Sequence, residues 1–186
     1  MDLTASDTKF IERFSMPNRW TFEMAPVKDL LHEVLGGADV VVDPFSGRSV
    51  VGTHRNDIVG GMDAEEWLDS VDVVADAFLM DPPYSPAQIK RSYSEAGIPT
   101  SMSSTQNARM MKVVRDHCHR LLRPGGVAVS FGWNSQGMLS FGYKRTHLML
   151  VRHGGAHNDT IVCVDVKHSR PEPEVRLNLQ EWSNEE

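Results

Sequence analysis

The sequence predicts an α/β fold, in which helices pack on a mostly parallel sheet that ends in an antiparallel hairpin. The first observation is that short continuous apolar runs alternate along the chain with segments whose apolar residues recur at helical spacing. The second is that the last two strand-like segments are separated only by residues 153–159. Such a short connection allows an antiparallel hairpin, whereas a parallel pair needs a crossover of about a dozen residues or more.

In the first half of the chain, a helix and several strands are expected to follow one another. Apolar residues recur at helical spacing from Val27 to Val34, and the pair Gly36-Gly37 ends that helix. Residues 38–42 form a continuous apolar run, as expected for a strand that is buried on both faces of a parallel sheet. Further strands are predicted at residues 53–58, 59–63 and 77–80.

The second half begins with a segment that shows little periodicity. Residues 85–108 are polar and contain two prolines and a glycine, so they are predicted to be a long loop. Apolar residues then mark one face of a helix between Met110 and Leu122. After this helix, a buried strand is predicted at residues 127–131, and the two hairpin strands are predicted at residues 146–152 and 160–167. His153, His157 and Asn158, which lie in the hairpin connection, are interpreted as residues that set its turn.

Length and composition predict one domain, residues 1–167, followed by an acidic tail of residues 168–186. The chain has 186 residues, of which 40% are hydrophobic, enough to bury a single core. It contains no run of about 18 apolar residues, and it does not begin with a basic segment followed by an apolar one. We therefore expect a soluble, cytoplasmic protein that does not bind membranes.

The sequence predicts no metal site and no disulfide framework. The two cysteines, Cys118 and Cys163, lack the paired spacing of zinc ligands. His117 and His119 flank Cys118, but residues two apart on a helix point in different directions. The net charge of −6 is unusual for a protein that binds nucleic acid, although much of the acid lies in the tail.

The segment Asp81-Pro82-Pro83-Tyr84 has the chemistry of an amine-binding site. It follows a predicted buried strand, so it is expected at the carboxyl edge of the sheet, where open α/β folds bind ligands. The two prolines fix the backbone and remove two amide donors. A carboxylate beside the remaining carbonyl is an acceptor pair suited to an –NH2 group, and Tyr84 offers a flat face for a base. The alternative is that the prolines end a strand and Asp81 caps the turn.

A second segment, Asp43-Pro44-Phe45-Ser46-Gly47-Arg48-Ser49, follows the first predicted strand. It lacks the third glycine of a dinucleotide fingerprint, and it is not a phosphate-binding P-loop. An aspartate followed by a tight turn suits a zwitterionic ligand better than a pyrophosphate. An ordinary turn is the alternative.

Together these segments resemble those of amino-methyltransferases that act on DNA, and more narrowly those of the small phage and prophage DNA adenine methylases. The resemblance covers residues 12–167, and the two segments keep the order in which cofactor motifs precede the catalytic motif. The stretches that carry it are Ser15-Met16-Pro17-Asn18, Thr21-Phe22, Asp43-Pro44-Phe45-Ser46-Gly47, Asn56-Asp57, Met62-Asp63-Ala64, Asp81-Pro82-Pro83-Tyr84, Ser85-Pro86 with Gln88-Ile89, Leu122-Arg123-Pro124-Gly125-Gly126, Phe131-Gly132-Trp133-Asn134-Ser135 and His153-Gly154-Gly155-Ala156-His157-Asn158-Asp159-Thr160-Ile161.

The resemblance implies a Rossmann-like methyltransferase fold that binds S-adenosylmethionine. Asp57 would then hold the ribose hydroxyls, and Asp63 and Ala64 would flank the adenine ring; an alternative alignment makes Asp63 the ribose carboxylate. Arg48 stands where related loops often have a small residue, and it either lies on the surface or faces the cofactor carboxylate. The residues implied at the rest of the cofactor site are Thr21, Phe22, Asp43, Pro44, Phe45, Ser46 and Gly47.

The implied activity is transfer of the cofactor's methyl group to the exocyclic amine of adenine in DNA, with short or loose sequence specificity, as in phage or restriction–modification enzymes. The alternatives are methylation of RNA or of cytosine N4, and a methyltransferase-like subunit that binds nucleic acid without turnover. The sequence does not determine the oligomeric state, and a homodimer is one alternative. The catalytic residues are expected to be Asp81, Pro82, Pro83 and Tyr84, and the contacts to DNA are expected from Lys90, Arg91, Tyr93 and Arg109.

Overall fold

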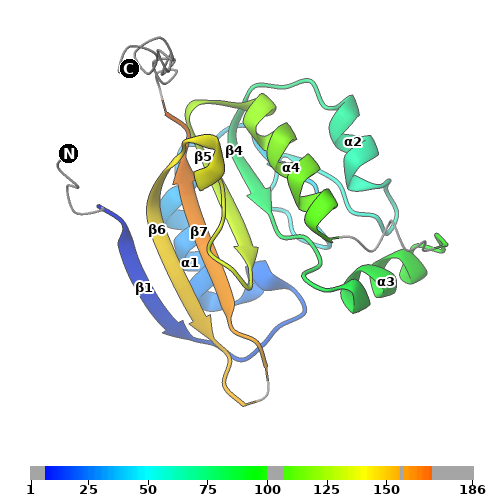
Figure 1. Cartoon of the computed structure of the whole chain (residues 1–186), viewed down its shortest axis with the longest axis horizontal. Helices are drawn as coiled ribbons and strands as arrows, with labels where there is room; N and C mark the ends of the chain where they lie inside the picture. The colour runs from blue at the N-terminus through cyan, green and yellow to red at the C-terminus, as the bar shows by residue number, and fades with distance from the viewer. Residues whose placement is uncertain (1–6, 100–106, 156, 169–186) are drawn as a thin grey trace, which may run out of the picture.

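The computed structural model describes residues 7–99, 107–155 and 157–168, which form a seven-stranded mixed sheet with helices on both faces (Figure 1). The order of strands across the sheet is β1-β6-β7-β5-β4-β2-β3. The strands are β1 (Lys9–Phe14), β2 (Val41–Asp43), β3 (His54–Arg55), β4 (Ala75–Met80), β5 (Leu122–Gly132), β6 (Lys144–Arg152) and β7 (Thr160–Val166). The helices are α1 (Ala25–Val34), α2 (Ala64–Ser70), α3 (Pro86–Glu95) and α4 (Asn107–Leu121), with 3₁₀ turns at Thr21–Glu23 and Leu139–Phe141.

Strand direction confirms the expected fold class. Strands β3, β2, β4 and β5 are parallel, whereas β7 runs antiparallel to both of its neighbours, β5 and β6. The hairpin predicted from the short connection is therefore present, and its second strand is inserted between the first strand and the parallel part of the sheet. Among the described residues, no helix is long and apolar enough to cross a membrane.

Two apolar cores lie on opposite faces of the sheet. On one face, α1 buries Val27, Leu30 and Leu31 against strand residues that include Leu79. On the other face, α2 and α4 cover the neighbouring residue Phe78. Because β4 is buried on both faces, its residues 77–80 form a continuous apolar run, which is why the strand could be predicted.

The structure contradicts the strand predicted at residues 59–63. These residues form a turn, and the next regular element is α2. The side chain of Asn56 closes this turn by donating to the Met62 carbonyl (2.9 Å) and accepting from the Met62 amide (3.2 Å). A Cβ at Gly61 would come within 2.4 Å of the Asp57 carbonyl oxygen, so only glycine fits there. The strand predicted at residues 53–58 is limited to His54–Arg55.

The prediction of a long loop at residues 85–108 is also wrong for the residues that the structure describes. Residues 86–95 form α3, and residues 100–106 lie outside the described residues. Ser85 caps this helix by accepting the Gln88 amide (3.3 Å), while the Gln88 side chain accepts the Ser85 amide (3.1 Å). Pro86 occupies the first turn, where its missing N–H costs nothing. The polar composition of residues 86–95 therefore gave no periodic apolar signal for this helix, although the helix is well capped.

The cap at Ser85 gives a test of this helix. Replacing Ser85 with alanine should lower the free energy of unfolding by about 1 kcal/mol, because the Gln88 amide loses its acceptor at the helix start. Urea denaturation measures the change. Ser94→Ala, an exposed position in the same helix, is the matched control and should leave stability within about 0.5 kcal/mol. Equal losses in the two variants would contradict the capping role.

Candidate active site at the carboxyl edge of the sheet

The candidate site lies where the chain reverses direction across the sheet. From β2 the chain moves outward to β3, and it then returns to β4 on the other side of β2. The crevice outside such a reversal, at the carboxyl ends of the strands, is where open α/β sheets bind ligands. Asp43 is the last residue of β2, and Asp81 follows the last residue of the adjacent β4. The two predicted segments therefore share one edge of the sheet.

Asp43 is a fully buried carboxylate with one unused oxygen. Its Oδ1 accepts the Phe45 amide (3.2 Å), whereas Oδ2 has no hydrogen-bond partner among the described residues. Burial raises the pKa of Asp43 to about 7; the Phe45 hydrogen bond opposes that rise, and the negative charges of Asp81 and Asp57 add to it. A buried polar oxygen without a partner is costly, so the arrangement favours a bound ligand that donates a hydrogen bond there.

The loop after Asp43 is fixed by the residues that follow β3. The Ser46 amide (2.8 Å) and hydroxyl (3.0 Å) both donate to the Asn56 carbonyl, and the Gly47 amide donates to Asp57 Oδ2 (3.0 Å). Gly47 has a φ of +53°, and a Cβ there would come within 2.7 Å of the Trp20 ring. The glycine thus allows the loop to approach the segment that precedes α1.

Arg48 is held on the outside of this loop. Its guanidinium makes two hydrogen bonds to the Glu23 carboxylate (2.7 and 2.6 Å) and lies 4.8 Å from the centre of the Trp20 ring. More than half of the Arg48 side chain is exposed. The structure therefore places Arg48 on the surface, with its charge paired to Glu23.

Asp81 is held by side chains from two segments. The Tyr84 hydroxyl donates to Asp81 Oδ1, and the Thr21 side chain also hydrogen-bonds to the carboxylate. Burial raises the pKa of Asp81 to about 6, and these two hydrogen bonds limit the rise. Burial, with the neighbouring Asp81 charge, raises the pKa of Tyr84 well above its ordinary value, so Tyr84 stays a donor at neutral pH. Thr21, from the segment before α1, is thus brought to the Asp81 segment.

The Tyr84 ring is part of an aromatic pair at this edge. Its centre lies 5.8 Å from that of Trp133, which follows β5 and is 43% exposed. The Tyr84 amide donates to Gln88 Oε1 (2.6 Å), so the first turn of α3 fixes the backbone after Pro83. In the core that α1 covers, Phe22 is buried and its ring centre lies 5.1 Å from that of Phe131.

Asp57 and Asp63 both lie in the connection from β3 to α2, and both carboxylates already accept hydrogen bonds. Asp57 accepts the Val59 amide (2.9 Å) in addition to that of Gly47. Asp63 caps α2 by accepting the Glu65 amide (2.9 Å), and its other oxygen accepts the Tyr93 hydroxyl. Ala64, the first residue of α2, is buried. The geometry is compatible with either carboxylate as the one that holds a ribose.

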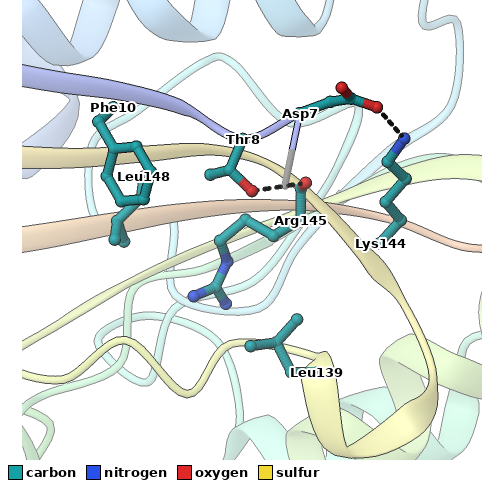
Figure 2. Close-up of a pocket in the computed structure, with 7 residues that line it drawn as sticks. All are labelled: Asp7, Thr8, Phe10, Leu139, Lys144, Arg145 and Leu148. Carbon is teal, nitrogen blue, oxygen red and sulfur yellow. Dashed lines mark hydrogen bonds and ion pairs between the residues drawn. The ribbon is translucent and has the colours of Figure 1, made fainter. Parts of the chain in front are cut away.

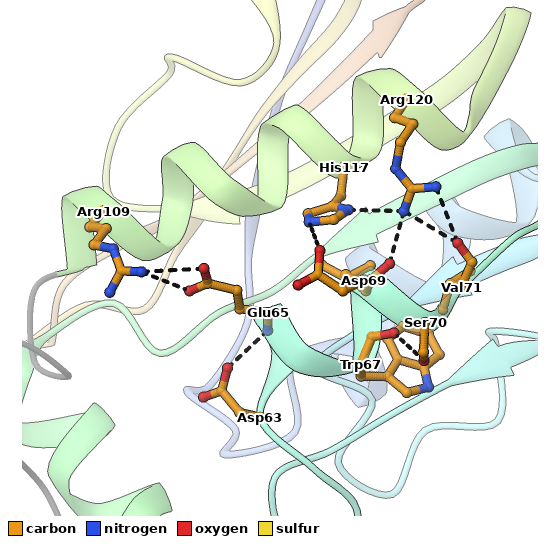
Figure 3. Close-up of polar contacts among 10 residues, drawn as sticks. Asp63, Glu65, Trp67, Asp69, Ser70, Val71, Arg109, His117 and Arg120 are labelled. Atoms are coloured by element: carbon orange, nitrogen blue, oxygen red, sulfur yellow. Dashed lines mark hydrogen bonds and ion pairs between the residues drawn. The ribbon is translucent and has the colours of Figure 1, made fainter.

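The residues expected to contact DNA have different surroundings. Lys90 and Arg91 are exposed on α3, beside the Asp81 segment, and neither forms an ion pair with a described residue. Tyr93, on the same helix, donates to Asp63 instead of facing outward. Arg109, at the start of α4, pairs with Glu65 on α2 at 3.2 Å, as Figure 3 shows.

The histidines have structural contacts. His153 is buried, with Nδ1 2.9 Å from the Ser15 carbonyl and Nε2 2.9 Å from the Thr160 hydroxyl, which confirms its interpretation as a turn residue. His117 lies 3.4 Å from Asp69 (Figure 3), whereas the His119 ring packs on Phe141.

A hollow of about 390 Å³ lies elsewhere on the molecule (Figure 2). Lys144 and Arg145, two of its lining residues, begin β6, which runs in the same direction as β4. The hollow is therefore at the amino edge of the parallel strands, opposite Asp43 and Asp81. Its remaining lining residues are Asp7, Thr8, Phe10, Leu139 and Leu148.

Two side chains near the candidate site were not predicted from the sequence. Trp20 packs against Gly47 and Arg48, and Glu23 pairs with Arg48. The position of Trp20, next to Thr21 and Phe22, was the only sequence signal for both.

Comparisons with known proteins do not identify a family for this chain. No protein-family model matches the chain, and no curated protein matches it significantly. Among solved structures, the crystal structure of N-methyltransferase NodS from Bradyrhizobium japonicum WM9 is similar, with a TM-score of 0.41 and 12% identity over 87% of this chain and 86% of that chain. The strand order itself, with antiparallel β7 between β5 and β6, is typical of S-adenosylmethionine-dependent methyltransferases. The chain has a methyltransferase-like fold.

Proposed function

We propose that this chain transfers the methyl group of S-adenosylmethionine to the exocyclic amine of adenine in DNA. The observation that carries the proposal is the pairing of two different acceptors at one edge of the sheet. Asp81 with the Pro82 carbonyl suits a planar amine, and Asp43 has a buried oxygen without a partner among the described residues. Adenine and DNA come from the resemblance of the Asp81-Pro82-Pro83-Tyr84 segment.

The residues around Asp43 fit the cofactor. The unused Asp43 oxygen would accept from its ammonium group, and the close approach allowed by Gly47 would admit the methionine part of the molecule. Asp57 or Asp63 would accept from the nucleoside. Bound there, the cofactor supplies an electrophilic methyl group on its sulfonium.

The Asp81 segment would orient the acceptor nitrogen. In adenine the lone pair of the amine is delocalised into the ring, so the nitrogen is a poor nucleophile. Hydrogen bonds from the –NH2 group to the Asp81 carboxylate and the Pro82 carbonyl would favour a more tetrahedral nitrogen directed at the methyl group. Such positioning supplies much of the rate enhancement in reactions of this kind. The hydrogen bonds from Tyr84 and Thr21 would keep the Asp81 carboxylate in place.

The target base must leave the duplex to reach this edge, which costs a few kcal/mol of unpairing and unstacking. The Tyr84 ring would recover part of that cost by stacking on the base. The exposed Lys90 and Arg91 lie on the helix that follows Tyr84, where they would contact the phosphates beside the flipped base.

The decisive experiment incubates the protein with methyl-labelled cofactor and duplex DNA, RNA or no nucleic acid. We expect label in DNA, recovered as N6-methyladenine after digestion. Label in RNA or in N4-methylcytosine would replace the proposed substrate with that one. Label in neither nucleic acid, although the protein binds the cofactor, would contradict the proposal and favour a non-catalytic methyltransferase-like chain.

Tyr84→Ala tests the stacking role. Relative to Tyr84→Phe, which also lacks the hydroxyl that bonds Asp81, the variant should lose about tenfold in rate on duplex DNA, because stacking of a base on an aromatic side chain contributes about 1–3 kcal/mol. The loss should be smaller on DNA whose target adenine is unpaired, where less unstacking has to be offset. Single-turnover rates on the two substrates give the comparison. A larger loss on the unpaired target would assign Tyr84 to a different step.

A further inference from the structure

Helix α3 connects the two halves of the candidate site. It starts directly after Tyr84 and Ser85, and it is anchored at Ile89, which is fully buried. Tyr93 lies one turn beyond Ile89, so the two side chains share a face of the helix. The hydroxyl of Tyr93 donates to Asp63 Oδ2, at the start of α2. One end of α3 is thus joined to the segment for the amine, and the other end is joined to a carboxylate of the cofactor loops.

The Asp63 carboxylate is held by one donor on each oxygen. The Glu65 amide binds Oδ1 at 2.9 Å and the Tyr93 hydroxyl binds Oδ2. An ionised carboxylate has about four acceptor positions, so two remain for a ligand. Partial burial and the neighbouring Asp63 charge raise the pKa of Tyr93, so its hydroxyl remains a donor at neutral pH.

We propose that Tyr93 is a positioning residue that orients the Asp63 carboxylate toward the nucleoside part of the cofactor. This inference rests on the proposed function, and it holds whether Asp63 accepts from the ribose hydroxyls or from the adenine amine. Without the Tyr93 hydroxyl, Asp63 keeps a single orienting donor, and its free oxygen must be ordered when the ligand binds. Because α3 also follows Tyr84, Tyr93 ties cofactor binding to the position of the Asp81-Pro82-Pro83-Tyr84 segment.

The test is the affinity of Tyr93→Phe for S-adenosylhomocysteine, measured by isothermal titration calorimetry. We expect about fivefold weaker binding, the effect of one orienting hydrogen bond. Tyr143→Phe is the matched control: it removes a buried hydroxyl that has no hydrogen-bond partner among the described residues, and Tyr143 packs in the core on the α4 side. It should leave the affinity unchanged.

A double-mutant cycle separates positioning from a general effect on the fold. In an Asp63→Asn background, Tyr93→Phe should cause no further loss of affinity, because Tyr93 acts through the Asp63 carboxylate. An equal loss in both backgrounds would overturn the inference, as would a Tyr93→Phe affinity within twofold of the wild type or tighter than it. Failure of the folded wild-type protein to bind the cofactor product would instead overturn the proposed function, and the inference with it.

Discussion

Replacing Asp81 with alanine should reduce methyl transfer by about 10²–10³-fold or more, the cost of losing one preorganised polar contact to the reacting group. The carboxylate sits at the carboxyl end of β4 and is held there by Tyr84 and Thr21. Its removal takes away one of the two acceptors proposed for the amine, whereas the loops around Asp43, where we propose that the cofactor binds, remain. Cofactor affinity should therefore stay within a few-fold of the wild-type value.

A graded variant makes this prediction sharper. Asp81→Asn keeps an acceptor oxygen, so its rate should fall between those of the wild type and Asp81→Ala. Single-turnover assays with labelled cofactor measure the rates, and calorimetry measures cofactor binding. Near-normal turnover in Asp81→Ala would remove the catalytic assignment.

The pH dependence of the same assay adds a second check. Burial raises the pKa of Asp81 to about 6, so the carboxyl is increasingly protonated below that pH and cannot accept two hydrogen bonds as effectively. The wild-type rate should therefore rise with pH through about 6, with a further contribution from the nearby Asp43. In Asp81→Asn, the part of the rise that belongs to Asp81 should be absent.

The parts of the fold that could be predicted from the sequence are the buried elements whose apolar residues follow a local pattern. Strand β4 and helix α1 are buried, so their apolar residues follow a continuous or helical pattern. Strand β1 is an edge strand in which most side chains are exposed, so it carries no such pattern and was not predicted. Helices α2 and α3 are short and polar, and their local signals were confined to the first turn: the capping residues Asp63 and Ser85, and Pro86 with Gln88 in α3.

The candidate site likewise has features that could be predicted from the sequence and features that could not. That Asp43 and Asp81 share an edge follows from each ending a buried strand, which the sequence shows. The partners of Arg48 and Tyr93 depend on segments that are distant in sequence, Glu23 and Asp63, and no local pattern encodes such pairs. The unused oxygen of Asp43 is likewise a property of the packed structure.

Asp43→Asn should stabilise the free protein at pH 8 by about 2–3 kcal/mol. The reason is that folding raises the pKa of Asp43 from an ordinary 3.8 to about 7, so keeping this carboxylate ionised lowers the free energy of unfolding. The expected gain is a part of the free energy that this pKa shift corresponds to. Between about pH 4 and 7, the folded protein binds a proton that the unfolded chain has released. Stability from this group is therefore complete at low pH and is lost as pH rises through 7. Asparagine does not ionise, and its carbonyl oxygen can still accept the Phe45 amide.

Urea denaturation of the free protein at pH 4, 6 and 8 measures this difference. The curves of the wild type and Asp43→Asn should be close at pH 4 and should separate as the pH rises. Ser46→Ala, which removes a side-chain hydrogen bond in the same loop without an ionisable group, is the control and should change stability equally at every pH.

Cofactor binding by Asp43→Asn should change in the opposite direction. The variant lacks the negative charge that would pair with the cofactor's ammonium group, so its affinity should fall by more than about tenfold, since hydrogen bonds to charged groups contribute about 1.5–3 kcal/mol. A buried aspartate that served only the fold would make the variant less stable and would leave ligand binding unchanged. Greater stability together with weaker binding is expected only if the buried charge at Asp43 is kept for a ligand, because its cost to the folded protein is then offset when the ligand binds.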